Sequence, residues 1–253
     1  MKDSYAKIYS EFSKNNELTT MAHFVAIRGR NYEENHDRRL MIVGRAPNGW
    51  LQFTDYSNET EFGKIAEDQF CAQDRMTHSN GDLIQENGWL DNKNGSLYSF
   101  HCPNYCVSNK AFWSYSKRIF DLLIPDREGE DIWPEQIVWS NLYKVSPVNS
   151  GNPTYEIMKR QKDICIDILK KELDFFAPTH ILLITGYDWF EPFATVFNNV
   201  ESRGEKNINR GAHKNKVYVE GTATYGNAKV VIACRPEFRD QDGYVKEVFE
   251  YLL

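Results

Sequence analysis

Four short apolar runs, each followed by a loop-forming segment, are the main hydrophobic pattern along the chain. They cover residues 39–43, 137–139, 180–185 and 229–233, and each leads into glycine, proline or a hydrogen-bonding side chain. Segments with helical periodicity separate them, and strands that alternate with helices build parallel sheets with helices on both faces. The pattern therefore predicts an α/β protein, a three-layer α/β/α sandwich with a central four-stranded parallel sheet.

The segments between the runs have the spacing of amphipathic helices. Apolar residues at i, i+3, i+4 and i+7 predict a short helix over residues 5–12. Thr154 has the side chain of a helix N-cap and opens a longer apolar face. Phe112 and Trp113 lie in another such segment and are predicted to be core. These two helices cover residues 154–176 and 109–124, and two more helices are predicted over residues 188–198 and 244–253.

The length and composition of the sequence predict a single domain over residues 1–253. Its 253 residues are enough for one large core, and no Pro/Gly/Ser-rich linker divides them. We expect an N-terminal helical segment over residues 1–38. An irregular insertion is expected over residues 51–97, because Asn-Gly turns recur there and sustained periodicity is weak. A hairpin is expected over residues 217–231.

Charge and hydropathy narrow the classes of partner. The formal net charge is -6, so contact with nucleic acid has to be local rather than a property of the whole surface. No apolar run approaches the roughly 20 residues of a membrane span, and the N-terminus has no signal-peptide pattern. These features predict a cytoplasmic protein that does not bind a membrane.

The five cysteines are scattered along the chain, which is typical of reduced thiols. Cys102 and Cys106 are spaced closely enough to face one metal ion, but no second close pair completes a four-ligand site. We therefore expect neither a metal nor another cofactor.

The ends of the apolar runs carry the candidate chemistry. In an open parallel sheet, ligands bind where the carboxyl ends of the strands meet the following loops. Arg45 follows the first run, Asn141 ends the second and Arg235 follows the fourth. Two arginines favour an anionic ligand such as a phosphate. The alternatives are that the arginines pair with acidic side chains and that Asn141 binds its own loop.

The motifs at these positions resemble the uracil-DNA glycosylase superfamily. Residues 141–189 resemble its central block, where a strand ends in asparagine, a lysine follows, and a helix leads to a strand ending in glycine. Residues 44–48 (Gly-Arg-Ala-Pro-Asn) resemble the first motif, and residues 234–237 (Cys-Arg-Pro-Glu) stand in the place of the last. Residues 100–113 are similar to the mismatch-specific branch, since a phenylalanine precedes a proline by three and a Phe-Trp pair follows.

The resemblance implies a site for a nucleobase extruded from DNA. It implies that Phe100 stacks on the base and that Asn141 reads the Watson–Crick edge of the base. The loop residues that it places at the base are Gly44, Arg45, Ala46, Pro47 and Asn48.

The chain departs from the superfamily at the catalytic positions. Relatives carry an acid or asparagine in the first motif where this chain has Arg45 and Ala46. Arg235 replaces the usual histidine or asparagine of the last motif and keeps the ability to donate to a base carbonyl or a phosphate. Glu237, two residues beyond, is the substitute acid that we consider first, and Asp55 and Asp188 are two further candidates. Residues 141–189 resemble most the thermostable iron-sulfur branch of the superfamily. The close N-terminal cysteine pair of that branch is missing here, so no cluster is expected.

Three hypotheses of function remain open. The leading one is recognition of a nucleobase or nucleotide, in DNA, without a settled catalytic role. The second is a DNA glycosylase that hydrolyses the N-glycosidic bond of a damaged base with Glu237 and Arg235. The third is a small-molecule enzyme or sensor for a free phosphorylated ligand. Lys144, Arg210 and Lys214 are the predicted phosphate contacts, the last two in a basic run that is alternatively a solvated loop.

Overall fold

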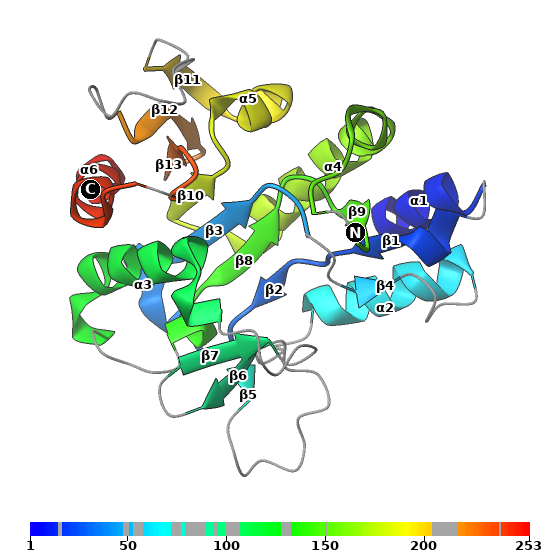
Figure 1. The fold of residues 1–253 in the computed structure, drawn as a ribbon, viewed down its shortest axis with the longest axis horizontal. Helices are drawn as coiled ribbons and strands as arrows, with labels where there is room; N and C mark the ends of the chain where they lie inside the picture. Colours follow the sequence, from blue (N-terminus) through cyan, green and yellow to red (C-terminus); the bar gives the residue numbers. More distant parts are fainter. Residues whose placement is uncertain are drawn as a thin grey trace.

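A mixed β-sheet with helices on both faces forms the centre of the protein. The computed structural model (Figure 1) describes residues 1–14, 17–47, 51–52, 58–71, 77–78, 90–93, 96–99, 107–127, 133–149, 151–203, 217–237 and 239–253. Within these residues, seven strands form the main sheet in the order β11-β12-β13-β10-β3-β8-β2. The protein is therefore of the predicted α/β class.

Four neighbouring strands at the centre of this sheet run parallel. They are β13 (Ala228–Ala233), β10 (His180–Ile184), β3 (Leu40–Gly44) and β8 (Val138–Asn141). These strands lie in the four apolar runs, and their apolar side chains are buried on both faces of the sheet. The register pairs Gly44 with Asn141. The ends of the two strands therefore meet at one edge of the sheet.

The predicted strand number is wrong, because three antiparallel strands extend the sheet. β12 (Val219–Tyr225) pairs with β13 as the predicted hairpin, and β11 (Asn198–Ser202) pairs with β12. β2 (Ile27–Arg28) pairs with β8 on the other edge. β11 is mostly exposed and polar, and β2 has only two residues. The sequences of β11 and β2 therefore lack the apolar run that predicts a buried strand.

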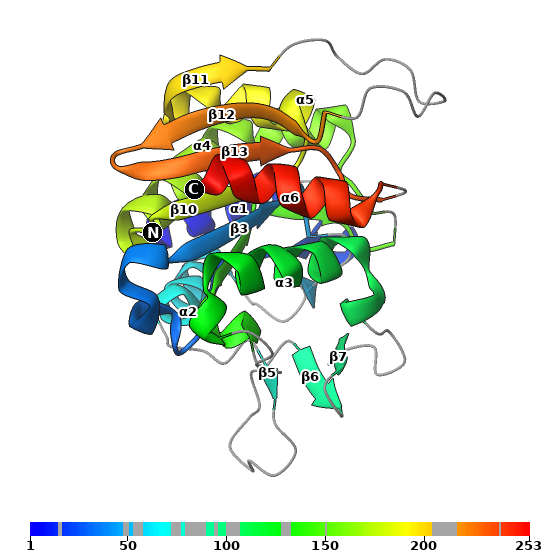
Figure 2. The ribbon, with the colours of Figure 1, turned by 90° about the vertical axis from the view of Figure 1, so that its left-hand side faces the viewer.

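Alternate side chains of the central strands face two separate cores. Met41 and Val43 pack on the side of helix α4 (Tyr155–Phe176), whereas Leu40 and Ile42 face the opposite core. The opposite core includes helices α3 (Ala111–Leu123) and α6 (Gln241–Leu252). Figure 2 shows α3 and α6 in front of the sheet and α4 behind it. The helices therefore form a layer on each face.

The helix boundaries follow their capping residues. Thr154 accepts a hydrogen bond from the Ile157 backbone amide at 3.4 Å, as predicted for an N-cap. Ala177, with φ 43°, ends α4 in the left-handed conformation.

The predicted helix over residues 188–198 is instead one turn, α5 (Tyr187–Phe190), followed by a 3-10 helix, η7 (Glu191–Val196).

The N-terminal segment is not helical throughout. Helix α1 (Lys2–Ser13) ends early, and short elements follow it up to residue 38. Among them, β1 (Met21–His23) pairs with β4 (Leu51–Gln52) and β9 (Val145–Pro147) in a second sheet. The 3-10 helices of this part and of the later connections are η1 (Glu17–Thr20), η2 (Tyr32–Arg38), η4 (Val107–Asn109), η5 (Pro125–Arg127) and η6 (Trp133–Gln136).

The expected irregular insertion over residues 51–97 contains regular structure. Helix α2 (Glu59–Cys71) lies there, and its Phe62 packs against Tyr5 of α1 with ring centroids 6.2 Å apart. Tertiary packing on α1 thus orders a segment whose own periodicity is weak. A third sheet contains β5 (Thr77–His78), β6 (Leu90–Lys93) and β7 (Ser96–Ser99). In the described part of the chain, the helices are too short or too polar to cross a bilayer.

Candidate functional site

The loops that follow the four parallel strands are tied together by backbone hydrogen bonds. The Tyr143 amide donates to the Arg45 carbonyl at 3.0 Å, and the Gly186 amide donates to the Ala233 carbonyl at 2.9 Å. The loops after β3 and β8, and those after β10 and β13, are thereby held as pairs. We give the name strand-end site to the following residues, which lie at or near the carboxyl ends of the parallel strands: Gly44, Arg45, Phe112, Asn141, Asp188, Trp189, Glu220, Arg235 and Glu237.

Arg45 is the most constrained cation of the strand-end site. Its Nε donates to the Thr185 carbonyl at 2.5 Å, and its guanidinium carbon lies 5.0 Å from the centre of the Trp189 ring. Burial, followed by the nearby charge of Arg235, lowers the pKa of Arg45 to about 10, so it remains charged at neutral pH. The carboxylates that oppose this lowering of the Arg45 pKa belong to Glu237, Glu220 and Asp188.

The second arginine is paired with an acid from its own loop. The Nε of Arg235 donates to Glu237 Oε2 at 2.9 Å, and a terminal guanidinium nitrogen contacts Oε1. The alternative of an arginine paired with an acid thus describes Arg235 in the structure. Both partners are partly exposed, which keeps the pair weak and exchangeable.

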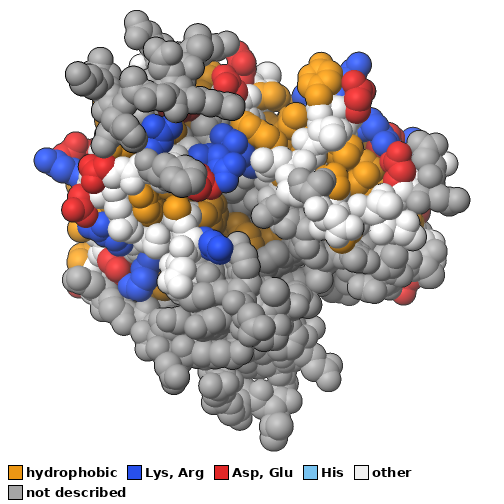
Figure 3. Space-filling model, viewed as in Figure 1, with side chains coloured by type: hydrophobic (Ala, Val, Ile, Leu, Met, Phe, Trp, Pro, Cys, Tyr) orange, Lys and Arg blue, Asp and Glu red, His pale blue; other side chains and the backbone are white. Residues whose placement is uncertain are grey.

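Acidic groups balance the positive charge at the strand-end site. Glu220 accepts a hydrogen bond from the Tyr187 backbone amide at 2.7 Å, and Asp188 and Glu237 add two further carboxylates near Arg45. Figure 3 shows Lys and Arg side chains close to the centre of the face viewed in Figure 1, next to hydrophobic side chains. A phosphate at this position has to compete with Glu237 for Arg235.

Asn141 brings an amide to the same edge. Asn141 is only 3 % exposed, and its Nδ2 has no hydrogen-bond partner among the described residues. The alternative that this amide nitrogen binds its own loop is therefore not observed. A buried polar group without a partner costs about 1–3 kcal/mol, and such groups in native proteins call for an explanation. A ligand atom that accepts a hydrogen bond from Nδ2 would remove this cost.

Gly44 makes room for the Asn141 amide. A β-carbon at residue 44 would lie 2.4 Å from Asn141 Oδ1 and 3.6 Å from the Phe112 ring. The first distance is far inside van der Waals contact, so only glycine permits this placement of Asn141.

The predicted phosphate contact at Lys144 is wrong. Its side chain is fully buried, and its Nζ lies 2.7 Å from Glu172 Oε1 of α4. The segment after β8 turns back toward the core, because Gln161 Oε1 accepts hydrogen bonds from the backbone amides of Lys144 and Val145 at 3.0 and 2.9 Å. The ammonium group is therefore directed at Glu172.

The other predicted residues divide into two groups. Ala46 packs against the core on the α4 side and Pro47 is buried, so both shape the loop after β3. The candidate acid Asp55 and four predicted contacts lie outside the described residues; the contacts are Asn48, Phe100, Arg210 and Lys214.

Sequence reasoning missed three members of the strand-end site. Trp189 stands three residues after the glycine that follows β10, a spacing that was available as a signal. Glu220 lies on the antiparallel strand β12, for which no strand-end rule applies. Phe112, predicted as core, is only partly buried and borders Gly44.

Comparison with known proteins gives the chain no assigned family. No protein-family model matches the sequence, and no curated protein matches it. Among the described residues, no group of three or more His, Cys, Asp or Glu side chains is arranged to hold a metal ion.

Proposed function

We propose that the strand-end site binds a nucleobase, carried in DNA or in a nucleotide, and that Asn141 reads the edge of the base. The observation that carries this proposal is the buried Asn141 Nδ2, which has no hydrogen-bond partner among the described residues and lies at the carboxyl end of the parallel strands. Ring nitrogens and carbonyl oxygens of a base accept hydrogen bonds from such an amide. The resemblance to uracil-DNA glycosylases, made of motifs at the same strand ends, points in the same direction.

Neighbouring residues supply the other contacts that a base requires. Phe112 offers a partly buried ring beside Gly44, at the strand end that carries Asn141. Arg45 uses Nε for the Thr185 carbonyl, and its terminal nitrogens make no hydrogen bond among the described residues. They can donate to a base carbonyl or to a phosphate.

The acids of the strand-end site favour binding over hydrolysis. Breaking an N-glycosidic bond needs negative charge to stabilise the positive sugar of the transition state. Glu237 is paired with Arg235, and Glu220 accepts from the Tyr187 amide. The carboxylate proposed as a substitute is therefore neutralised by its own neighbour. We retain glycosylase activity through Glu237 as an outcome that the experiments below decide.

The proposal is tested by fluorescence anisotropy at low salt. Labelled single- and double-stranded DNA carries uracil, hypoxanthine or xanthine at one position, and a matched probe carries an abasic analogue there. We expect tighter binding to at least one base than to the abasic probe. Equal affinity for all probes, together with no thermal shift by free nucleotides, would contradict the proposal. A thermal shift with nucleotides alone would assign the site to a free ligand.

Replacing Glu237 with glutamine separates binding from catalysis. Because Arg235 is then released, affinity for phosphate-bearing probes should rise roughly two- to fivefold, the scale of an exposed ion pair. Loss of an abasic product that the wild type forms, detected by alkaline strand cleavage, would instead establish Glu237 as a catalytic acid. The charge-matched control is Glu250→Gln on α6, because the Glu250 carboxylate also has a basic partner, Lys246.

Replacing Gly44 with alanine tests the placement of Asn141. The added methyl group would overlap Asn141 Oδ1, so the side chain has to move. We expect affinity for the preferred base to fall about tenfold, the loss of roughly one hydrogen bond. Gly226→Ala, in the turn between β12 and β13, is the control. The positive φ of residue 226 strains an alanine, but a β-carbon there meets nothing within 4 Å among the described residues, so this variant shows the effect of a destabilising Gly→Ala change that leaves Asn141 in place. Unchanged base affinity in Gly44→Ala would show that Asn141 is not the reader.

A further inference from the structure

A buried ion pair lies directly behind Asn141. Lys144 Nζ is 2.7 Å from each of three oxygens, which belong to the Ser140 hydroxyl, the Asn141 backbone carbonyl and the Glu172 carboxylate. Lys144 and Glu172 are both fully buried. The residue that donates the unpartnered amide is thus held through its carbonyl by a charged group.

The second carboxylate oxygen and a tyrosine complete the network. Ser140 Oγ donates to Glu172 Oε2 at 2.7 Å, and the Tyr5 hydroxyl of α1 donates to Glu172 Oε1 at 3.2 Å. Burial, and then the charge of Glu172, raise the pKa of Tyr5, so its hydroxyl remains a donor. The pair therefore connects α1, α4 and β8 at the strand that ends in Asn141.

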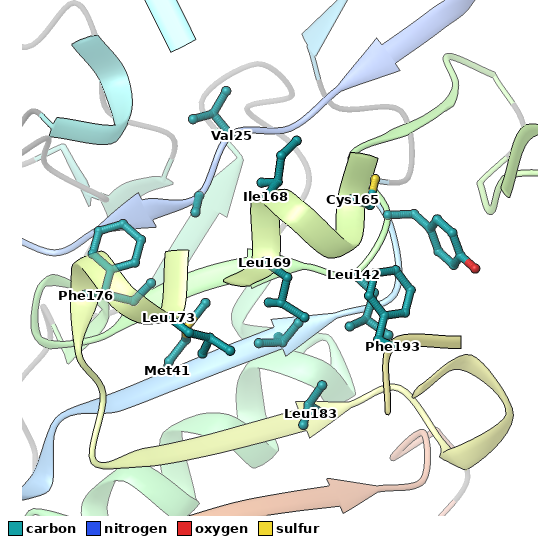
Figure 4. Packing of buried hydrophobic residues seen from close by; sticks show 14 of the residues in the cluster. Val25, Met41, Leu142, Cys165, Ile168, Leu169, Leu173, Phe176, Leu183 and Phe193 are labelled. Carbon is teal, nitrogen blue, oxygen red and sulfur yellow. The ribbon is translucent and has the colours of Figure 1, made fainter. Parts of the chain in front are cut away.

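Lys144 and Glu172 are fully buried on the α4 side of the sheet, where most of the other buried side chains are apolar. Figure 4 shows Leu169 and Leu173 of α4 facing Met41 and Leu183 of the sheet, with Leu142 in the same layer. In such surroundings the cost of removing two charges from water offsets most of their attraction, so the pair contributes little net stability over apolar residues. What it does contribute is a fixed direction for the groups that it contacts.

We infer that Lys144 and Glu172 are positioning residues that hold Asn141 in the orientation in which its amide meets a base. The inference rests on the proposed function for the identity of the ligand. The ammonium fixes the carbonyl of Asn141, and the space left by Gly44 fixes its side-chain oxygen. Neither Lys144 nor Glu172 contacts the base. Their effect passes through Asn141.

The test replaces both charges while keeping the shape and the acceptor of the network. In Lys144→Met/Glu172→Gln, the glutamine oxygen accepts from one of the hydroxyls of Tyr5 and Ser140, the glutamine NH2 donates to the oxygen of the other, and no buried charge is left alone. We expect a folded protein with a melting temperature near that of the wild type. Affinity for the preferred base should fall about tenfold, with affinity for the abasic probe unchanged. In an Asn141→Ala background, the same double replacement should have no further effect on binding.

A readout without ligand separates the inference from the proposed function. Two-dimensional ¹⁵N NMR of the free protein detects the Asn141 side-chain amide, assigned by its disappearance in Asn141→Ala. We expect this signal to shift or broaden in Lys144→Met/Glu172→Gln, but not in Lys117→Met/Asp121→Asn, which removes a partly exposed pair on α3.

The outcomes are distinct. An unchanged amide signal in the double variant overturns the positioning role. A changed signal in a protein that shows no base preference supports the positioning role and overturns the proposed function. Reduced base affinity that persists in the Asn141→Ala background would also overturn the inference, because the pair would then act by a route other than Asn141.

Discussion

Replacing Lys144 alone with methionine should lower the free energy of unfolding by about 3–5 kcal/mol. The single substitution leaves Glu172 as an unpaired charge at a fully buried position. Tyr5 and Ser140 still donate to the carboxylate, but neither supplies a compensating positive charge. The destabilisation is therefore the cost of an isolated buried carboxylate rather than the net value of the ion pair.

Urea denaturation followed by circular dichroism measures this effect. Lys144→Met/Glu172→Gln should recover most of the lost stability, since the uncompensated charge is gone. Lys117→Met, which breaks a partly exposed ion pair, should cost less than about 1 kcal/mol. A loss below about 1 kcal/mol in Lys144→Met would contradict the buried pairing of Lys144 with Glu172.

Replacing Asn141 with alanine should abolish the preference for a base over an abasic site. A good two-point contact between a side chain and a base is worth about 1–3 kcal/mol, which corresponds to about five- to 150-fold in affinity. The free energy of unfolding should respond differently, because the substitution removes a buried amide nitrogen that has no hydrogen-bond partner in the part of the chain that the structure describes. We expect the free energy of unfolding to remain within about 1 kcal/mol of the wild type.

Anisotropy titrations and urea denaturation on the same preparations check both expectations. Asn198→Ala, at an exposed position of β11, is the matched control and should change neither quantity. Base preference that survives in Asn141→Ala would remove Asn141 from the site. A large loss of stability would show that the amide has a structural partner.

The strands at the centre of the sheet were predictable because burial on both faces gives each of them an uninterrupted apolar run. The same rule fails at the edges of the sheet. β11 consists of Asn198–Ser202, which is largely polar and exposed, and β2 is two residues long. Their strand conformation comes from pairing with β12 and β8, which no local pattern encodes.

The residues of the candidate site were predictable only where the position of a residue along a strand decides where it lies in the fold. Gly44 and Asn141 meet because they end two adjacent parallel strands. Lys144 was placed at a phosphate because it follows a strand end, but the direction of its side chain depends on Glu172 and Gln161 of a distant helix. Such tertiary partners are invisible to reasoning from local spacing.

The most direct test of the account is whether the Asn141 side-chain amide responds to a base. We would record ¹⁵N NMR spectra of the wild type during titration with nucleoside monophosphates and short oligonucleotides, with ribose 5-phosphate and an abasic oligonucleotide as matched ligands. The account predicts that the Asn141 amide signals shift with a base-bearing ligand and stay in place with the ligands that lack a base. Binding of a base-bearing ligand with unchanged Asn141 signals, or no response to any of these ligands, would contradict it.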